Sequence, residues 1–169
     1  MNRVNINEIK EDPWQSPNGK FAVAFKGISE ALGRGRARES GHRASTDSEE
    51  RHPFDLEWNR MPPGKPNFPF HSHSAQWEMY LVVNGKGSVR DKDGTTEVVP
   101  GDAFIFGPNE PHQITNSGDV DLIYYVIADN PIGESGYYPD SKKWIVNRTS
   151  PAHRIVIRGN ETDYFDGEE

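Results

Sequence analysis

Hydrophobic residues are concentrated in the middle of the chain, where they form short runs separated by turn residues. Phe54 to Met61 begins with alternating apolar and polar positions, as a half-buried strand does. Further short runs cover residues 68–73, 79–83, 87–90, 95–99, 103–106, 112–115 and 120–128. The hairpin pairs Asn84-Gly85 and Asp93-Gly94 separate some of them, and none shows a helical period. This pattern predicts an all-β barrel or sandwich.

The segments on either side are more polar, which suggests one domain with a central core. Residues 1–53 are interpreted as an N-terminal arm and polar loop, with a strand at 20–25 and a short helical turn at 29–33. The barrel core is expected at residues 54–130. Residues 131–169 are expected to be a C-terminal extension that packs on the barrel. A chain of 169 residues fits this single-domain organisation.

Charge and composition argue against several partners and sites. The net charge is −7, so a nucleic-acid or acidic membrane surface is not an expected partner, because phosphate contacts need clustered lysine and arginine. The chain contains no cysteine, which rules out disulfides, thiolate metal sites and a cysteine nucleophile. The sequence shows no apolar signal core and no run of membrane-spanning length, so a cytoplasmic protein is expected.

The candidate chemistry lies in three histidines and one glutamate. His71 and His73 are two residues apart, so on a strand their side chains leave the same face. Glu78 begins one apolar run and His112 begins another. Imidazoles and a carboxylate are ligands for a divalent transition metal, and strands lining one barrel could bring all four to one interior point. Nucleophile elbows, phosphate-binding glycine loops and dinucleotide fingerprints are absent.

Residues 64–116 contain two blocks that resemble the conserved motifs of the cupin superfamily. The first block comprises Gly64, His71-Ser72-His73, Glu78 and Gly85, and the second comprises Gly101, His112 and Asn116. Two positions depart from the second motif: Pro108 is one place late, and Glu110 stands where the family prefers glycine. These departures leave His112 in register but predict a differently shaped turn before it.

The resemblance implies a small antiparallel jelly-roll, or double-stranded β-helix, barrel with irregular N- and C-terminal arms. It also implies a metal near one mouth of the barrel, with His71, His73, Glu78 and His112 as ligands. A metal-free site, in which the histidines act as acid–base groups as in some sugar epimerases of related fold, is the alternative. Residues 135–141 are similar to a segment of bacterial single-domain cupins, some of which are labelled sugar-phosphate isomerases, although a fold alone does not give the reaction.

One divalent ion of Fe, Mn, Ni, Zn or Co would suit these ligands. Four protein ligands close a tetrahedral zinc sphere but leave two positions open on an octahedral ion, so an open site favours Fe, Mn or Ni. The expected function is a metal-dependent enzyme, an isomerase or dioxygenase, acting on a small polar, oxygen-rich substrate. The alternatives are a non-catalytic protein that binds or senses a sugar or other small molecule, and a purely structural metal.

Three further residues are candidates for substrate binding, and each has a structural interpretation as well. Tyr80 and Phe104 could line the cavity or pack in the core, and Arg60 could bind an anionic substrate or form a surface ion pair. Exposed sheet edges need cover. We therefore expect a homodimer in which the arms at residues 1–30 and 130–160 are exchanged or packed against the other copy.

Overall fold

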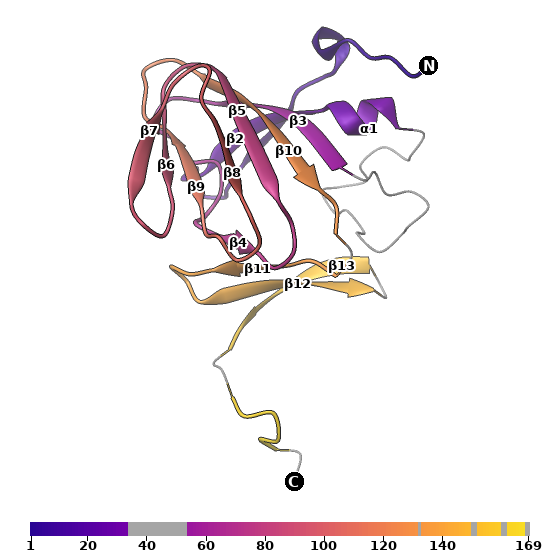
Figure 1. The fold of residues 1–169 in the computed structure, drawn as a ribbon, viewed down its shortest axis with the longest axis vertical. Helices are drawn as coiled ribbons and strands as arrows, with labels where there is room; N and C mark the ends of the chain where they lie inside the picture. Colours follow the sequence, from indigo (N-terminus) through magenta and orange to yellow (C-terminus); the bar gives the residue numbers. More distant parts are fainter. Residues whose placement is uncertain (34–53, 132, 150–151, 160–161, 168–169) are drawn as a thin grey trace.

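The computed structural model describes residues 1–33, 54–131, 133–149, 152–159 and 162–167, and the regular structure among them consists mainly of antiparallel strands (Figure 1). The helical elements are the 3₁₀ turn η1 (Ile6–Glu8) and helix α1 (Ile28–Leu32). The strands are β1 (Asp12–Gln15), β2 (Ala22–Gly27), β3 (Phe54–Met61), β4 (Ser72–His73), β5 (Glu78–Asn84), β6 (Gly87–Arg90), β7 (Thr95–Val98), β8 (Ala103–Phe106), β9 (Gln113–Asn116), β10 (Leu122–Asp129), β11 (Ser135–Tyr138), β12 (Lys143–Thr149) and β13 (Ala152–Arg158). The predicted all-β, antiparallel class is confirmed.

The strands form a six-stranded sheet and two smaller sheets that are joined by bridges. The six-stranded sheet has the order β1-β2-β3-β10-β5-β8, and the smaller sheets are β7-β6-β9 and β13-β12-β11-β4, which we call the C-terminal sheet. The bridges His71↔His112 and Pro66↔Thr115 connect β9 to the segment that leads into β4. His71 and His112 exchange backbone hydrogen bonds of 3.2 and 2.8 Å. Two of the predicted ligands are therefore direct neighbours across strands.

The core lies between the facing sheets, and it is formed by the alternate side chains of each strand that point inward. Met61 and Leu122 are completely buried, and Tyr124, Val82 and Ile114 are nearly so. Burying an aliphatic or aromatic side chain of this size contributes about 1.5–3 kcal/mol. In β5 the inner positions alternate with exposed ones. Glu78 is two residues from Tyr80 and four from Val82, so it shares their inward face.

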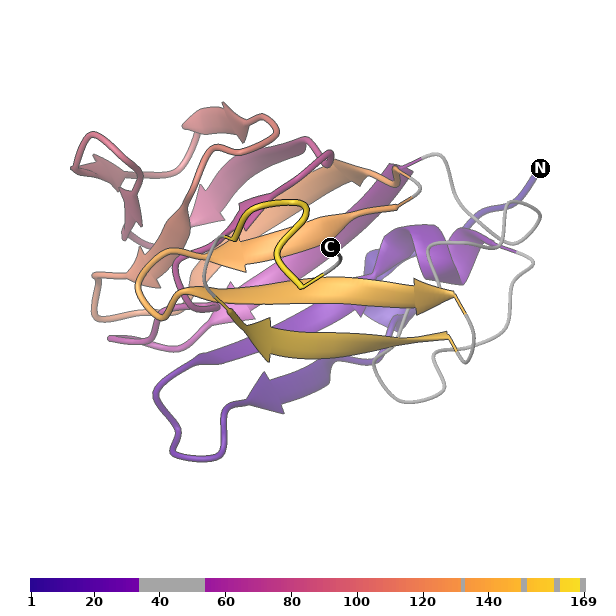
Figure 2. The same cartoon turned by 90° about the horizontal axis from the view of Figure 1, so that it is seen from below.

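The chain outside the central region also supplies strands. The strand and helical turn expected at residues 20–25 and 29–33 are present as β2 and α1, and β1 and β2 extend the six-stranded sheet beside β3. Strands β11 to β13 extend from β4 and form a layer at the end of the barrel where β4 lies (Figures 1 and 2). Residues 34–53, which include the predicted polar loop, lie outside the described residues. In the described part of the chain, no helix is long and apolar enough to cross a membrane.

Candidate metal centre

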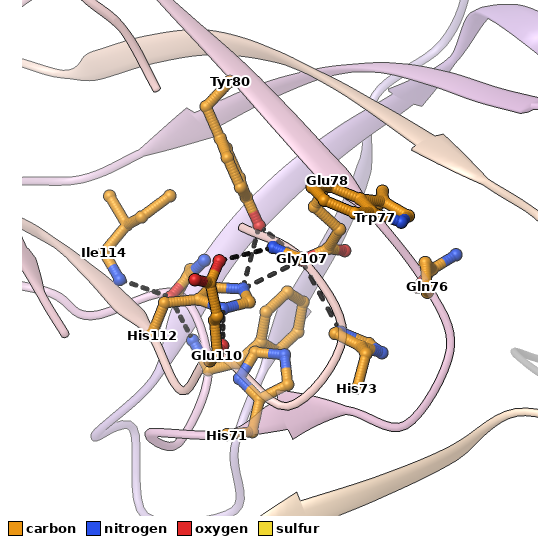
Figure 3. Close-up of polar contacts among 12 residues, drawn as sticks. His71, His73, Gln76, Trp77, Glu78, Tyr80, Gly107, Glu110, His112 and Ile114 are labelled. Carbon is orange, nitrogen blue, oxygen red and sulfur yellow. Dashed lines mark hydrogen bonds and ion pairs between the residues drawn. The ribbon is translucent and has the colours of Figure 1, made fainter. Parts of the chain in front are cut away.

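The four residues singled out in the sequence meet at one point inside the barrel (Figure 3). One nitrogen from each histidine and one oxygen from Glu78 all lie within 4.8 Å of one another. His71 and His73 come from the segment around β4, Glu78 is the first residue of β5, and His112 directly precedes β9. His112 is buried, and the other three are half-buried. The cluster could hold a metal ion.

Two of the distances within the cluster are close to those between neighbouring ligands of a single ion. Oε2 of Glu78 is 2.8 Å from Nε2 of His112 and 3.5 Å from Nε2 of His73. The ring centroid of His71 lies 5.0 Å from that of His73 and 4.9 Å from that of His112. Two adjacent ligands at about 2.1 Å from one ion lie roughly 3 Å apart. The donor atoms are therefore close enough to share one cation.

The other ring nitrogen of each histidine faces an oxygen acceptor. Nδ1 of His71 lies 2.8 Å from the carbonyl oxygen of Pro69, and Nδ1 of His112 lies 3.1 Å from that of Glu110. Nδ1 of His73 lies 3.2 Å from a carboxylate oxygen of Glu134. These acceptors assign the hydrogen to Nδ1 in all three rings, so each Nε2 lone pair is available to the cluster. Metal-ligating histidines use this arrangement, in which the outer hydrogen bond fixes the tautomer and the ring orientation.

The electrostatics also keep His71 and Glu78 in the forms that bind cations. Burial, together with the neighbouring His73 and His112, lowers the pKa of His71 to about 3, so this imidazole is neutral. Burial alone would raise the pKa of Glu78, but His73 and His112 outweigh it and hold that pKa well below its usual range. A neutral imidazole and an ionised carboxylate are the states in which these side chains bind metals. The donor set thus fits a divalent transition metal.

Tyr80 adds a hydroxyl to the inner edge of the cluster. Its Oη donates a hydrogen bond of 2.7 Å to Oε2 of Glu78 and lies 3.3 Å from Nε2 of His112. Burial and the charge of Glu78 raise the pKa of Tyr80 well above its ordinary value, so the phenol stays protonated. Its ring stacks on Phe104, with centroids 5.0 Å apart. Two of the three candidate substrate-binding residues therefore lie at or directly behind the cluster.

Arg60, the third candidate, is on the opposite face of its strand. Its neighbours in β3, Asn59 and Met61, are buried, and its guanidinium forms ion pairs of 2.7 Å with Glu11 and 3.0 Å with Asp121. The structure does not bring Arg60 to the cluster, because alternate side chains of a strand leave opposite faces of the sheet.

The turn before His112, where the sequence departs from the motif, is held by a left-handed residue and by hydrogen bonds. Asn109 has a positive φ of 65°, a conformation that asparagine tolerates better than most residues. The Gly107 amide donates to a carboxylate oxygen of Glu110 at 2.7 Å, and the Asn109 amide donates to the His73 carbonyl at 2.7 Å. The Glu110 side chain thereby closes the turn, and the turn is tied to the strand that carries His73.

Sequence reasoning missed two residues of the C-terminal sheet region that contact the histidines. One oxygen of Glu134 accepts hydrogen bonds from His73 Nδ1 and from the Ser74 amide, at 3.2 and 3.1 Å. The ring of Tyr138 stacks on His71, with centroids 5.9 Å apart. Both residues come after the central apolar runs in the sequence. Their position beside the histidines depends on the pairing of β11 with β4, and no hydrophobic periodicity in the sequence indicates that pairing.

Glu134→Gln is expected to weaken metal binding about 10- to 100-fold, as is typical when an outer hydrogen-bond partner of a metal ligand is altered. The amide keeps an acceptor for Nδ1 but loses the negative charge that makes the imidazole a better donor. Competition with a coloured chelator measures the affinity. Asp129→Asn is the matched control, because Asp129 accepts from a nearby amide, that of Trp77, at 2.8 Å. Equal affinities in the two variants would contradict this role for Glu134.

Comparisons with known proteins concern the domain that carries this cluster. Residues 57–128 match the family model of the cupin domain. An oxalate-binding protein of Thermotoga maritima is 28% identical over 68 residues, which are 40% of this chain and 55% of that protein. The chain thus spans about half the length of this curated relative.

Two solved structures resemble nearly the whole chain. A sugar phosphate isomerase of the cupin superfamily from Silicibacter pomeroyi has a TM-score of 0.72 at 19% identity and covers 92% of both chains. A protein from Acidithiobacillus ferrooxidans, named as a candidate sugar phosphate isomerase, has a TM-score of 0.72 at 20% identity and covers 93% of both chains. At these identities the likeness shows a shared fold, and it confirms the predicted jelly-roll barrel. The chain therefore contains a cupin domain, which the family model matches over residues 57–128.

Proposed function

We propose that this protein is a metal-dependent enzyme that acts on a small, polar, oxygen-rich substrate. One divalent transition metal ion would be held by the four clustered side chains, His71, His73, Glu78 and His112. The observation that carries the proposal is the combination of four donors within 4.8 Å and an oxygen acceptor on Nδ1 of every histidine. Four protein ligands leave two positions of an octahedral ion for substrate, so Fe, Mn or Ni is favoured over tetrahedral Zn.

The side chains around the centre would position the substrate and exclude water. When bound, the ion would supply a Lewis acid for a carbonyl or enediol oxygen. The Tyr80 hydroxyl, kept protonated by burial, donates its one hydrogen to Glu78, and a substrate oxygen beside Glu78 could accept that hydrogen bond in its place. Phe68 and Tyr138 both lie against the His71 ring, with centroids 6.3 and 5.9 Å away, and add apolar surface beside it.

Isomerisation is the reaction type that we favour over oxygen-dependent cleavage. Support comes from the names of the two proteins that share the fold over more than nine tenths of their length, one given as a sugar phosphate isomerase and the other as a candidate for this activity. An isomerase of this type needs a metal or an acid that polarises a carbonyl, together with a hydrogen-bond donor beside it. The clustered donors and Tyr80 could supply both requirements.

A non-catalytic binding protein is the second candidate, and one comparison favours it. The relative from Thermotoga maritima is named an oxalate-binding protein. Oxalate offers two oxygens that can occupy adjacent positions on one metal ion. The same centre could therefore retain a small dicarboxylate without changing it.

Elemental analysis of protein purified without added metal is the first test, and about one Fe, Mn or Ni per chain is expected. The loaded protein is then incubated with phosphorylated aldoses and ketoses, with interconversion followed by NMR, and oxygen uptake is recorded in parallel. Interconversion supports the isomerase, and oxygen uptake supports the oxygenase. A raised melting temperature with oxalate but no turnover supports the binding protein. Absence of any bound transition metal would overturn the proposal.

We also propose that the protein is a homodimer, and the outer face of the six-stranded sheet supports this. Ile105, Met79 and Ile127 lie in register across β8, β5 and β10, and they are 55%, 41% and 38% exposed. Leu81, on the same face of β5 as Met79, is 42% exposed. Contiguous exposed apolar surface of this kind commonly marks an interface.

Leu81→Glu should therefore convert the dimer to a monomer in sedimentation velocity experiments, because a charge would be buried in an apolar contact. Val120→Glu is the control, since Val120 is 53% exposed but lies in the loop before β10. A wild-type protein that sediments as a monomer at tens of micromolar, roughly the range in which a typical dimer forms, would overturn this assignment.

A further inference from the structure

A row of side chains on the C-terminal sheet begins at the candidate metal centre and ends in two cations. The pairing of Gly136 with His73 and of Tyr137 with Ser72 places Tyr138 beside His71. In the same way Tyr138 is paired with Lys143, and Lys143 with Arg158. Directly opposite residues of antiparallel strands share a face of the sheet. His71, Tyr138, Lys143 and Arg158 therefore line one face, in this order.

Side-chain contacts agree with this order. The Tyr138 ring stacks on the imidazole of His71 at 5.9 Å between centroids, with an angle of 23° between the planes. Nζ of Lys143 lies 5.7 Å from the centroid of the same tyrosine ring. Tyr138 is thus the aromatic contact between a candidate metal ligand and a cation.

The two cations have no acidic partner among the described residues. Arg90, by contrast, forms two hydrogen bonds of 2.7 and 2.9 Å with Asp140, and Lys86 lies 2.6 Å from Glu97. Like charges directly opposite each other destabilise a sheet. In a chain of net charge −7, acidic residues outnumber basic ones. The repulsion between Lys143 and Arg158 therefore destabilises this part of the sheet, and a bound anion would remove that repulsion.

The distance between the candidate metal centre and the two cations suits a substrate that contacts both. Neighbouring strands are about 4.8 Å apart, so Lys143 and Arg158 arise two and three strands, or about 10 and 14 Å, from His71. Long lysine and arginine side chains can cover part of that distance. A small sugar with its oxygens at the metal and a phosphoryl group at its other end would span the remainder, along the ring of Tyr138.

We propose that Lys143 and Arg158 form an anion subsite that binds the phosphoryl group of the substrate. The arginine guanidinium presents paired donors that match phosphate oxygens, and the lysine ammonium adds a point charge. This inference deepens the proposed function and rests on it, because the metal centre fixes the other end of the substrate. The subsite itself needs no metal to bind an anion.

Inorganic phosphate is the probe, titrated by calorimetry into full-length protein with and without metal. Wild type is expected to bind phosphate in both states. Lys143→Met and Arg158→Met should each weaken binding about tenfold or more, because a charge-assisted hydrogen bond is lost. Lys142→Met is the matched control, since it removes the same charge one residue away and should change the affinity less than about twofold. A circular dichroism spectrum identical to wild type verifies that each variant is folded.

Phosphate relaxation near Mn(II) then tests the position of the subsite. With Mn(II) at the centre, ³¹P relaxation should place bound phosphate about 10 Å from the ion, as the strand spacing requires, and not in direct contact with it. Three results would overturn the subsite: no phosphate binding by wild type, equal weakening by Lys142→Met and Lys143→Met, or phosphate coordinated to the ion itself. If phosphate binds but no transition metal does, the proposed function fails while the anion site stands.

Discussion

His73→Ala protein is expected to lose nearly all of its bound metal while keeping its fold. The imidazole supplies one of four donors within 4.8 Å of one another. Its removal should cost more than the 10- to 100-fold loss that is typical of changes to outer hydrogen-bond partners. The side chain is 18% exposed, so alanine leaves a partly solvated gap and not a closed cavity in the core. Metal per chain, measured by elemental analysis after dialysis, should fall from about one to near zero.

Gln76→Ala is the control for this experiment. Gln76 lies in the same connection between β4 and β5, where its side-chain amide donates to the Asp129 carbonyl at 2.6 Å. It belongs to no part of the donor cluster, so its metal content should equal that of wild type. A His73→Ala protein that retains a full complement of metal would show that the ion is bound elsewhere, and the assigned centre would be wrong.

Asn116→Ala is expected to lower the free energy of unfolding by about 2–5 kcal/mol, because it leaves several buried backbone groups without partners. Asn116 is completely buried. Its Nδ2 donates to the carbonyls of Met61 and Val120, each at 2.8 Å, and its Oδ1 accepts from the Gly118 amide at 2.9 Å. The side chain thus joins the end of β3, the end of β9 and the loop that follows. Urea denaturation followed by fluorescence measures the change.

Asn84→Ala provides the comparison. Asn84 donates to the Asp121 carbonyl at 3.0 Å, but it is exposed, so water can replace the lost bond. Its effect should remain within about 0.5 kcal/mol. If both variants unfold at the same urea concentration, the role assigned to Asn116 is incorrect. The resemblance grouped Asn116 with His112, yet its contacts are with the backbone and not with the candidate centre.

The candidate donors could be found from the sequence because their chemistry and local spacing are both visible there. His71 and His73 share a face through the two-residue period of a strand, and Glu78 shares the inner face of β5 with Tyr80. The prediction for Arg60 had less support. The alternation of apolar and polar residues along β3 can be read from the sequence. Which face of the strand points inward, however, depends on its partners β2 and β10.

The residues that support the donors could not be found in this way. Glu134 and Tyr138 approach His73 and His71 because β11 pairs with β4, about sixty residues earlier in the chain. Long-range pairing leaves no periodic signal in either segment. The same pairing places Lys143 and Arg158 on the face that begins at His71.

The sequence by itself determined the all-β class, the short strands and the four donors, because turn residues, alternation and ligand chemistry are local properties of the chain. Only the tertiary structure decided which faces are inward, which acceptors hold each Nδ1, and which distant strand completes the surroundings of the histidines. Those features depend on contacts between strands that are far apart in sequence, and such contacts are set by how the whole chain packs.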